Sequence, residues 1–360
     1  IVRFNERISL NGQPISDDEL VKAAQKVAPV VDYLDQVLPE GGPTEFEIDT
    51  AIMFTWFAQK KPDVVILEVG IGGLYDSTNV IVPAVSGIVT VGYDHMHVLG
   101  DTLAEIACQK AGIIKPNVPV VIGRLPEAAR QTIIADAQEK QAPLYENGRQ
   151  FTAKKLNNHQ LRNEIEYDGL MLHRQKFQLS LLGEYQVDNA AVALTMAQLY
   201  LKRLGVPIDV QAFQNGLANT RWPGRLEIVN DSPLVVLDGA HNLPGMQALT
   251  TTLQNDFKEM EIYVLVAILA DKQYQLMLGE IASLPNVHLM LTNFAGPGPK
   301  RPSADLEKAA KDIKTHWPIE TASSWQEGLL RLSREVSADD AILITGSLYF
   351  ISEVRRFFAD

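Results

Sequence analysis

The stretch that decides the fold lies at residues 64–73, where the sequence reads VVILEVGIGG. Its first four residues form a continuous apolar run, which is typical of a strand buried on both faces of a sheet. Glycines at positions 70, 72 and 73 then allow the backbone to approach a ligand closely. A buried strand that ends in such a loop predicts a parallel sheet with a binding site at its carboxyl edge.

Strand and helix patterns alternate outward from this stretch. A capped amphipathic helix is expected from Ser16, with three acidic residues favouring its N-terminus. Further helices are expected over 45–59, 102–111, 126–140 and 188–204, and strands over 86–92 and 118–122. Residues 145–185 alternate instead between polar and apolar side chains, which predicts a small antiparallel patch.

A linker is expected at residues 222–226, where Pro and Gly occur together between two periodic regions. Beyond it the alternation restarts, with strands over 233–237, 262–269, 287–292 and 341–345 and helices over 245–257, 273–282, 303–314 and 325–335. The chain is therefore predicted to be an α/β protein of two domains, residues 1–221 and a smaller parallel-sheet domain at 227–360.

Composition narrows the class of protein. A length of 360 residues fits about two domains, and 32 basic against 44 acidic side chains give a net charge of −12, which argues against general nucleic-acid binding. The longest apolar runs, such as 262–270, are under half the length that crosses a bilayer. A single cysteine, Cys108, excludes an internal disulfide and fits a reducing cytoplasm. Since the sequence opens at Ile1 without Met or a signal-peptide pattern, we expect residues upstream.

Polar residues follow the strands of the first domain. Glu68 comes directly after the apolar run, Asp94 and His95 follow the next strand, and Lys110 lies in the helix after that. Taken singly, each has a structural explanation: an acid bonded to loop amides, a partly buried histidine, and a surface lysine. Together they place a carboxylate, an imidazole and an amine near one sheet edge.

A second group lies at the linker and beyond it. Arg225 could hold a phosphate between the domains, or form an ordinary salt bridge. Residues 238–242, DGAHN, follow a strand and precede a helix, so Asp238 and His241 suit ribose hydroxyls or an anion. The alternative is a capped turn in which the polar side chains satisfy backbone amides.

Eight groups of segments, taken in order along the chain, carry a resemblance to a known family. They are RFNERI at 3–8, EVGIGG at 68–73 with DSTN at 76–79, DH at 94–95 with LGDT at 99–102, QKAGI at 109–113, GEYQ at 183–186 with NAA at 189–191, WPGRLE at 222–227, LDGAHN at 237–242 and GSLYF at 346–350. The chain resembles the folylpolyglutamate synthase and dihydrofolate synthase group of the Mur ligase superfamily. The resemblance implies an ATP-binding α/β domain followed by a smaller Rossmann-like domain.

The resemblance also implies an activity. Such enzymes use ATP to phosphorylate a folate or pteroate carboxylate, and L-glutamate then displaces the phosphate. ATP and Mg²⁺ are the implied cofactors, small molecules are the implied partners, and a monomer is the implied state. The acceptor, dihydropteroate or tetrahydrofolate or both, stays open.

Carried over by position, the resemblance assigns roles to single residues. Glu68, His95 and a carbamylated Lys110 are similar to the family's Mg²⁺ ligands, and a carbamate would supply the oxygen donors that this ion prefers. Asp76, Lys110 and His241 match its catalytic positions, while Asn189, Arg225 and Asp238 match its nucleotide contacts. Arg3 and Phe4 match a loop near folate, and Ser347 a position near glutamate.

Two departures from the family pattern stand out. No segment of the 360 residues reads G-x-x-x-x-G-K-[ST], the loop that cradles ATP phosphates, and we expect the chain as written not to turn over ATP. Leu74 stands where many relatives carry arginine.

Two alternative functions remain at this stage. The 64–73 stretch also fits an S-adenosylmethionine methyltransferase, but Pro83 and strand-like residues follow it where such a site needs a helix. The other alternative is a degenerate paralogue that binds folate without catalysis.

Overall fold

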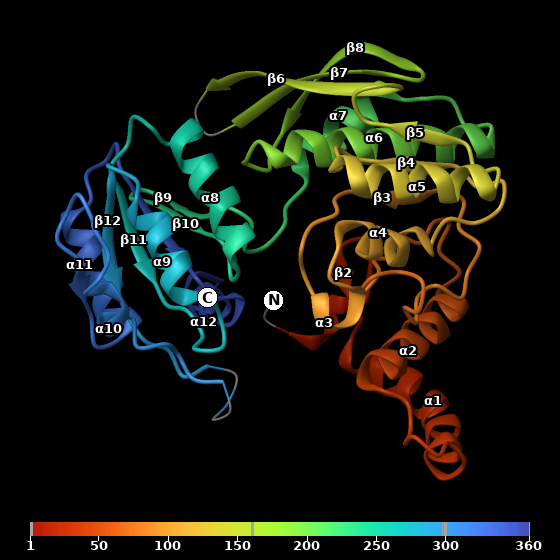
Figure 1. Ribbon diagram of the computed structural model, residues 1–360, viewed down its shortest axis with the longest axis horizontal. Helices are drawn as coiled ribbons and strands as arrows, with labels where there is room; N and C mark the ends of the chain where they lie inside the picture. The colour runs from red at the N-terminus through yellow and green to blue at the C-terminus, as the bar shows by residue number, and fades with distance from the viewer. Residues whose placement is uncertain (1–2, 160–161, 297, 299–300, 360) are drawn as a thin grey trace.

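The computed structural model describes residues 3–159, 162–296, 298 and 301–359. Two groups of elements lie side by side in Figure 1, one drawn in red to green and the other in cyan to blue. Among these described residues, no helix is both long and apolar enough to cross a membrane.

The chain begins with a helical layer. The 3-10 turn η1 (Phe4–Arg7) and the hairpin β1 (Ser9–Leu10) and β2 (Gln13–Pro14) precede α1 (Asp17–Val37) and α2 (Glu45–Lys60). Ser16 caps α1, as the sequence predicts, by accepting the Glu19 N–H, and a capping box of Thr44 and Glu47 starts α2. Their buried faces form a separate small core around Trp56.

A short parallel sheet follows. Its strands are β3 (Ser86–Ile88), β4 (Val120–Ile122) and β5 (Leu144–Glu146), hydrogen-bonded in that order. The core formed with α4 (Leu103–Ala111) and α5 (Glu127–Glu139) includes Ile88 and Ile122, whereas Val121 packs with α6 (Tyr185–Leu204). Helices thus cover both faces, as an α/β layer requires. The one-turn helix α3 (Met96–Leu99) lies before α4.

The prediction of a buried strand at 64–67 is wrong for this structure. Val64, Val65 and Ile66 are 52%, 44% and 94% exposed, and the segment is not assigned as strand. An apolar run forms a strand only where a neighbouring strand accepts its backbone hydrogen bonds, and none of the described strands pairs with this one. The strand expected over 86–92 is likewise shortened to β3.

The antiparallel patch is confirmed. Strands β6 (Phe151–His159), β7 (Arg162–Gly169) and β8 (Leu172–Leu179) form an antiparallel sheet in chain order. Phe151, Tyr167 and Phe177 are fully buried and pack with α6 and α7 (Val210–Asn219). The end of β6 reaches toward the blue half in Figure 1, where Lys155 bonds Asp256 of α8 at 2.7 Å.

The second half is built on one six-stranded sheet in the order β13-β12-β11-β14-β10-β9. The strands are β9 (Glu227–Asp231), β10 (Leu234–Leu237), β11 (Ile262–Val266), β12 (Val287–Leu291), β13 (Glu320–Thr321) and β14 (Ala341–Thr345). All pairs are parallel except β9 with β10. This confirms a parallel-sheet, Rossmann-like architecture.

Helices cover both faces of that sheet. The core on one face includes residues of α8 (Leu243–Asp256), α9 (Tyr274–Ala282) and α10 (Leu306–Ala310), and the other is built with α11 (Trp325–Glu335) and α12 (Leu348–Ala359). The sequence did not predict β9, β13 or α12, and the helix expected over 303–314 is reduced to α10.

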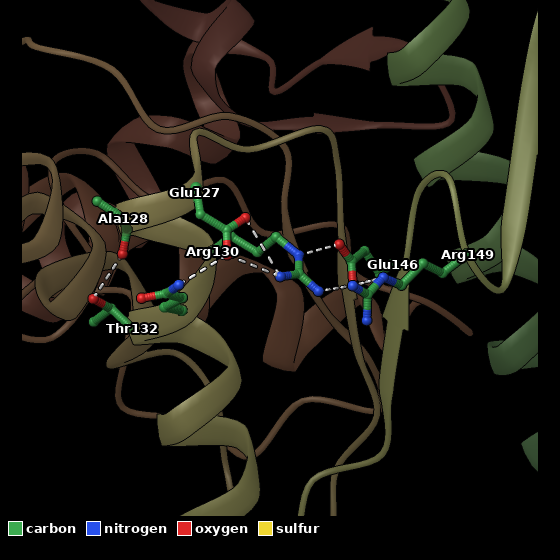
Figure 2. A network of polar contacts seen from close by, with 7 residues as sticks. Glu127, Ala128, Arg130, Thr132, Glu146 and Arg149 are labelled. Carbon is green, nitrogen blue, oxygen red and sulfur yellow. Dashed lines mark hydrogen bonds and ion pairs between the residues drawn. The ribbon is translucent and has the colours of Figure 1, made fainter.

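An ion-pair network fixes α5 to the end of β5 (Figure 2). Figure 2 shows Arg130 between Glu127 and Glu146, with Arg149 on the far side of Glu146. Arg130 Nη2 donates to Glu146 Oε2 at 3.0 Å, and its Nε donates to Oε1. The Arg130 and Glu146 side chains are only 15% and 10% exposed, so removing one partner would leave the other charge largely buried with only a longer ion pair, 3.4 Å from Arg130 to Glu127 or 3.3 Å from Arg149 to Glu146.

Candidate functional site

Asp76 organises the glycine-containing loop after residue 69. Its Oδ2 accepts the N–H groups of Gly70 and Ile71 at 3.0 and 2.9 Å, and its Oδ1 accepts the N–H and hydroxyl of Thr78 at 3.0 and 2.5 Å. These four bonds use the ordinary acceptor capacity of a carboxylate. The geometry therefore gives Asp76 the role of holding the loop in shape, and direct contact with substrate would require one of these bonds to break.

This loop packs tightly on the end of α4, which carries Lys110. The Leu74 N–H donates to the Gln109 carbonyl at 2.8 Å, and Asn79 Nδ2 donates to the Gly112 carbonyl at 3.1 Å. A Cβ on Gly73 would lie 2.9 Å from the Gln109 oxygen, and one on Gly112 would lie 2.3 Å from Leu74 Cα. The close approach explains both glycines, and it brings the loop and the Lys110 helix together.

The three residues proposed for Mg²⁺ lie on loops and at a helix end. Glu68 is exposed in the segment before the glycine loop, and Lys110 is half-buried in the last turn of α4. His95 starts α3 with a φ of 48°, its N–H bonded to Asp94 Oδ1 at 2.9 Å. Its Nε2 lies 3.9 Å from the same oxygen, and its ring centroid is 6.4 Å from that of His97.

The side chains proposed for Mg²⁺ offer oxygen and nitrogen donors. Within the described ranges, no three His, Cys, Asp or Glu side chains are placed to hold an ion, and the proposed set contains only two residues of these kinds plus a lysine. Mg²⁺ commonly takes one or two carboxylates and fills its shell with water and substrate phosphates. An exposed Glu68 and a carbamylated Lys110 fit that chemistry.

A buried carboxylate marks the junction of the two halves. Asp238 is 5% exposed at the end of β10, and it accepts the N–H groups of Leu226 at 3.0 Å and Ala240 at 2.9 Å. Burial raises the pKa of the Asp238 carboxyl, while these two donors and the charge of Arg225 oppose the rise. The carboxylate thus joins the linker to the strand end.

Arg225 and Tyr185 face this carboxylate. Arg225 Nη1 would be 3.3 Å from a Cβ built on Gly239, so the guanidinium passes directly over the strand end. Burial raises the pKa of the Tyr185 hydroxyl, the charge of Asp238 adds to the rise, and the charge of Arg225 opposes it. Tyr185 opens α6, so residues from both halves interact electrostatically at one place.

A hydrogen bond to the backbone determines which ring nitrogen of His241 carries the proton. Its Nδ1 lies 2.8 Å from the Gly239 carbonyl oxygen, which can only accept a hydrogen bond. Nδ1 therefore carries the proton, and in the neutral ring Nε2 keeps its lone pair. Asn242 caps α8 by accepting the Gly245 N–H at 2.8 Å, as the turn interpretation of this segment anticipates.

The remaining proposed residues are spread over both halves. Asn189, on α6, donates from Nδ2 to Gln186 Oε1 at 2.9 Å, and Ser347 is 2% exposed just after β14. Arg3 donates from Nη2 to both oxygens of Asp17 at 2.9 and 3.0 Å. Phe4 is 39% exposed, and the Arg7 guanidinium lies 5.0 Å from its ring centroid. Arg3 thus lies against the start of α1, and Phe4 is the first residue of η1.

Two residues of the site region were given no role from the sequence. Asn5 is 7% exposed and donates from Nδ2 to the Ile15 carbonyl at 2.7 Å and to Asp17 at 2.9 Å, which anchors the N-terminal segment. Tyr185 was noticed only as part of the GEYQ motif. Tyr185 lies about one helical turn before Asn189 on α6, but its electrostatic interaction with Asp238 depends on the fold.

Comparisons with known proteins give the class first. The family description "Mur ligase middle domain" matches residues 19–197, and "Mur ligase, glutamate ligase domain" matches residues 224–348. The fold and these matches define an acid–amino-acid ligase of the Mur type.

Individual relatives then narrow the family. The chain is 38% identical over 357 residues to "Folylpolyglutamate synthase" of Lacticaseibacillus casei, covering 99% of this chain and 81% of the relative. It is 37% identical over 376 residues to "Dihydrofolate synthase/folylpolyglutamate synthase" of Bacillus subtilis, with the same coverage of 99% and 81%. The chain belongs to the folylpolyglutamate synthase/dihydrofolate synthase family of Mur ligases.

Solved structures of folylpolyglutamate synthases agree with this family assignment. The apo form of L. casei folylpolyglutamate synthase superposes with a TM-score of 0.85 at 35% identity, covering 100% of this chain and 82% of that one. A structure described as "FPGS-AMPPCP-folate complex" superposes with a TM-score of 0.79 at 34% identity, covering 100% of this chain and 82% of that one. Neither the methyltransferase nor the non-catalytic alternative is favoured by these relatives.

Proposed function

We propose that this protein joins L-glutamate to a folate carboxylate in an ATP-dependent reaction that passes through an acyl phosphate. The single observation that supports this most is the linker junction, where the Arg225 guanidinium passes over the end of β10 and the buried Asp238 holds Leu226 and Ala240. A ligase of this kind must hold nucleotide and amino acid between its two halves. The relatives crystallised with AMPPCP and folate support the choice of substrates.

The reaction divides into two steps. A carboxylate oxygen of the acceptor attacks the γ-phosphorus of ATP, and ADP leaves. The glutamate amine, after losing a proton, attacks the acyl carbon, and phosphate departs with that carboxylate oxygen. Each step exchanges one bond for another, so no oxidant or reductant is needed.

The chain's own residues divide this work. Arg225 holds the phosphate oxygens through its fixed guanidinium fork, and Asn189 contacts the adenine base. Asp238 positions the linker beneath the nucleotide by holding Leu226 and Ala240. The Nε2 atom of His241 has the lone pair needed to accept the proton of the glutamate ammonium.

Other residues serve the acceptor and the metal. Glu68, His95 and a carbamate on Lys110 would hold Mg²⁺, and the bound ion would neutralise charge on the phosphate oxygens. Asp76 holds the loop that follows Glu68. Arg3, Phe4 and the segment around them lie toward folate, and Ser347 lies on the glutamate side.

The division of the chain belongs to the same proposal. Residues 1–221 form the unit for ATP and folate, residues 222–226 the linker, and residues 227–360 the glutamate-ligase unit. Sheet membership supports this division, since every strand of the six-stranded sheet comes from residue 227 onward. We further propose that the protein works as a cytoplasmic monomer without nucleic-acid or membrane partners, which its net charge of −12 supports.

Oxygen transfer tests the chemistry. The full-length gene product is incubated with ATP, Mg²⁺, L-glutamate and an acceptor in which both carboxylate oxygens are ¹⁸O, and the released phosphate is analysed by mass spectrometry. An acyl phosphate requires one ¹⁸O atom in each phosphate formed. Phosphate without label, accompanied by glutamylated product, would contradict the proposed intermediate. Parallel reactions with dihydropteroate and tetrahydrofolate identify the acceptor.

A further inference from the structure

The Glu227 carboxylate connects the linker to the last helix of the chain. Its Oε2 accepts the Gly224 N–H at 2.9 Å, and Arg355 Nε donates to its Oε1 and Oε2 at 3.0 and 2.9 Å. Arg355 lies on α12, and the two side chains are 26% and 20% exposed. A charge-assisted contact that is mostly shielded from water is stronger than an exposed ion pair.

The turn that Glu227 holds has an unusual backbone. Gly224 and Leu226 both have positive φ, 71° and 46°, and the second is a conformation that a leucine adopts at a cost. Two carboxylates stabilise it, because Glu227 accepts the N–H of Gly224 while Asp238 accepts the N–H of Leu226. Arg225 lies between these two residues, so its direction depends on both bonds.

The carbonyl of Gly224 is held as well. The Gly224 carbonyl accepts the Gly239 N–H at 2.8 Å, and the Arg225 guanidinium passes over Gly239. Moving Gly224 would therefore move the start of the Arg225 side chain relative to the β10 strand end. Loss of the Glu227 contact would leave Gly224 held only through its carbonyl.

Arg355 also lies near the N-terminal segment. The hydrogen bond to Glu227 is the main cause that raises the pKa of the Arg355 guanidinium, and the charges of Glu227 and Glu6 add to it. Glu6 belongs to η1, and Figure 1 places the red N-terminal segment between the two halves, near α12. The charges of the linker and of the N-terminal segment thus both act on this guanidinium.

We infer that Arg355 is a positioning residue for the phosphate clamp: through Glu227 it fixes the 222–226 turn and so directs Arg225. This inference rests on the proposed role of Arg225 toward the ATP phosphates. Arg355 acts on the clamp through Glu227 and the turn rather than on the nucleotide. Its loss should therefore weaken ATP binding selectively.

The test compares Arg355→Met with Arg355→Lys in the full-length gene product. Arg355→Met removes the donor and should raise KM for ATP about tenfold while KM for glutamate changes less than about threefold. Arg355→Lys keeps a cation that reaches Glu227, and it should restore most of the ATP affinity. The matched control is Arg334→Met, which removes an exposed arginine of α11 and should leave all constants at the parent values.

A double variant separates this inference from the proposed function. If Arg355 acts through Arg225, adding Arg355→Met to Arg225→Lys should raise KM for ATP no further. If the increases in KM for ATP caused by the two single substitutions multiply in the double variant, the positioning role of Arg355 is overturned. Equal losses for ATP, glutamate and folate together with a lowered Tm would overturn it too, as general destabilisation. If Arg225→Lys alone leaves KM for ATP unchanged, the proposed clamp itself is refuted.

Discussion

Removing the buried Asp238 carboxylate should destabilise the junction by a predictable amount. Asp238→Ala leaves two buried N–H groups, those of Leu226 and Ala240, without acceptors. Each unsatisfied donor costs about 1–3 kcal/mol, and release of a buried charge offsets part of the total. We expect a loss of about 2–3 kcal/mol for Asp238→Ala. Asp238→Asn retains one acceptor and should lose about 1–2 kcal/mol.

The assay is urea unfolding, followed by circular dichroism, of the parent and both variants. Asp209→Ala is the matched control, because Asp209 also accepts two backbone N–H groups, at 2.9 and 3.2 Å, but at the exposed start of α7. Water can replace that acceptor, so the control should lose only about 1 kcal/mol. Equal losses for Asp238→Ala and Asp209→Ala would refute the argument from burial.

The pH dependence of the free energy of unfolding of the same variants provides an independent test. Burial raises the pKa of Asp238 above its ordinary 3.8, so the folded state favours the protonated carboxyl. The stability that this group contributes is fully present below 3.8 and is lost as pH rises through the raised pKa. The parent's advantage over Asp238→Asn should therefore shrink as the pH rises above 3.8. An advantage that grows over this range would show that hydrogen bonding outweighs desolvation.

Three further changes test other parts of the account. Lys110→Ala should lower kcat by at least about 100-fold, with partial rescue by added short carboxylic acids in place of the carbamate; unchanged turnover would remove Lys110 from the site. Glu68→Gln should shift the Mg²⁺ titration of activity to higher concentration, and a curve that superimposes on the parent's would exclude Glu68 as a ligand. Glu146→Gln should lower the free energy of unfolding by about 2 kcal/mol, because the largely buried Arg130 then keeps only its 3.4 Å ion pair with Glu127, and a loss under about 1 kcal/mol would contradict the network of Figure 2.

The sequence predicted elements best where the signal is local. The Ser16 cap and the alternation of β6 to β8 depend on neighbouring residues, and both are confirmed. The 64–67 strand failed because apolar composition does not say which strand will pair with a segment. The edge strand β9 was missed since its residues are mostly half-buried and lack a core-like run.

In the candidate site, too, the sequence predicts local motifs but not the contacts between distant segments. The motifs around Asp76 and Asp238 were found from sequence, but their roles depend on which N–H groups reach each carboxylate. Asp76 bonds within its own loop, whereas Asp238 reaches back 12 residues to Leu226. Tyr185 joins the site only when the two halves meet, and no local pattern predicts that contact.

The most direct test of the central claim is ADP release by the full-length gene product with ATP, Mg²⁺ and L-glutamate, with dihydropteroate and tetrahydrofolate added in separate reactions. The account predicts that ADP forms only when glutamate and a pterin acceptor are both present, in equal amount to the glutamylated product. If ADP forms with neither acceptor, or if ADP release does not depend on glutamate, the ligase function is contradicted.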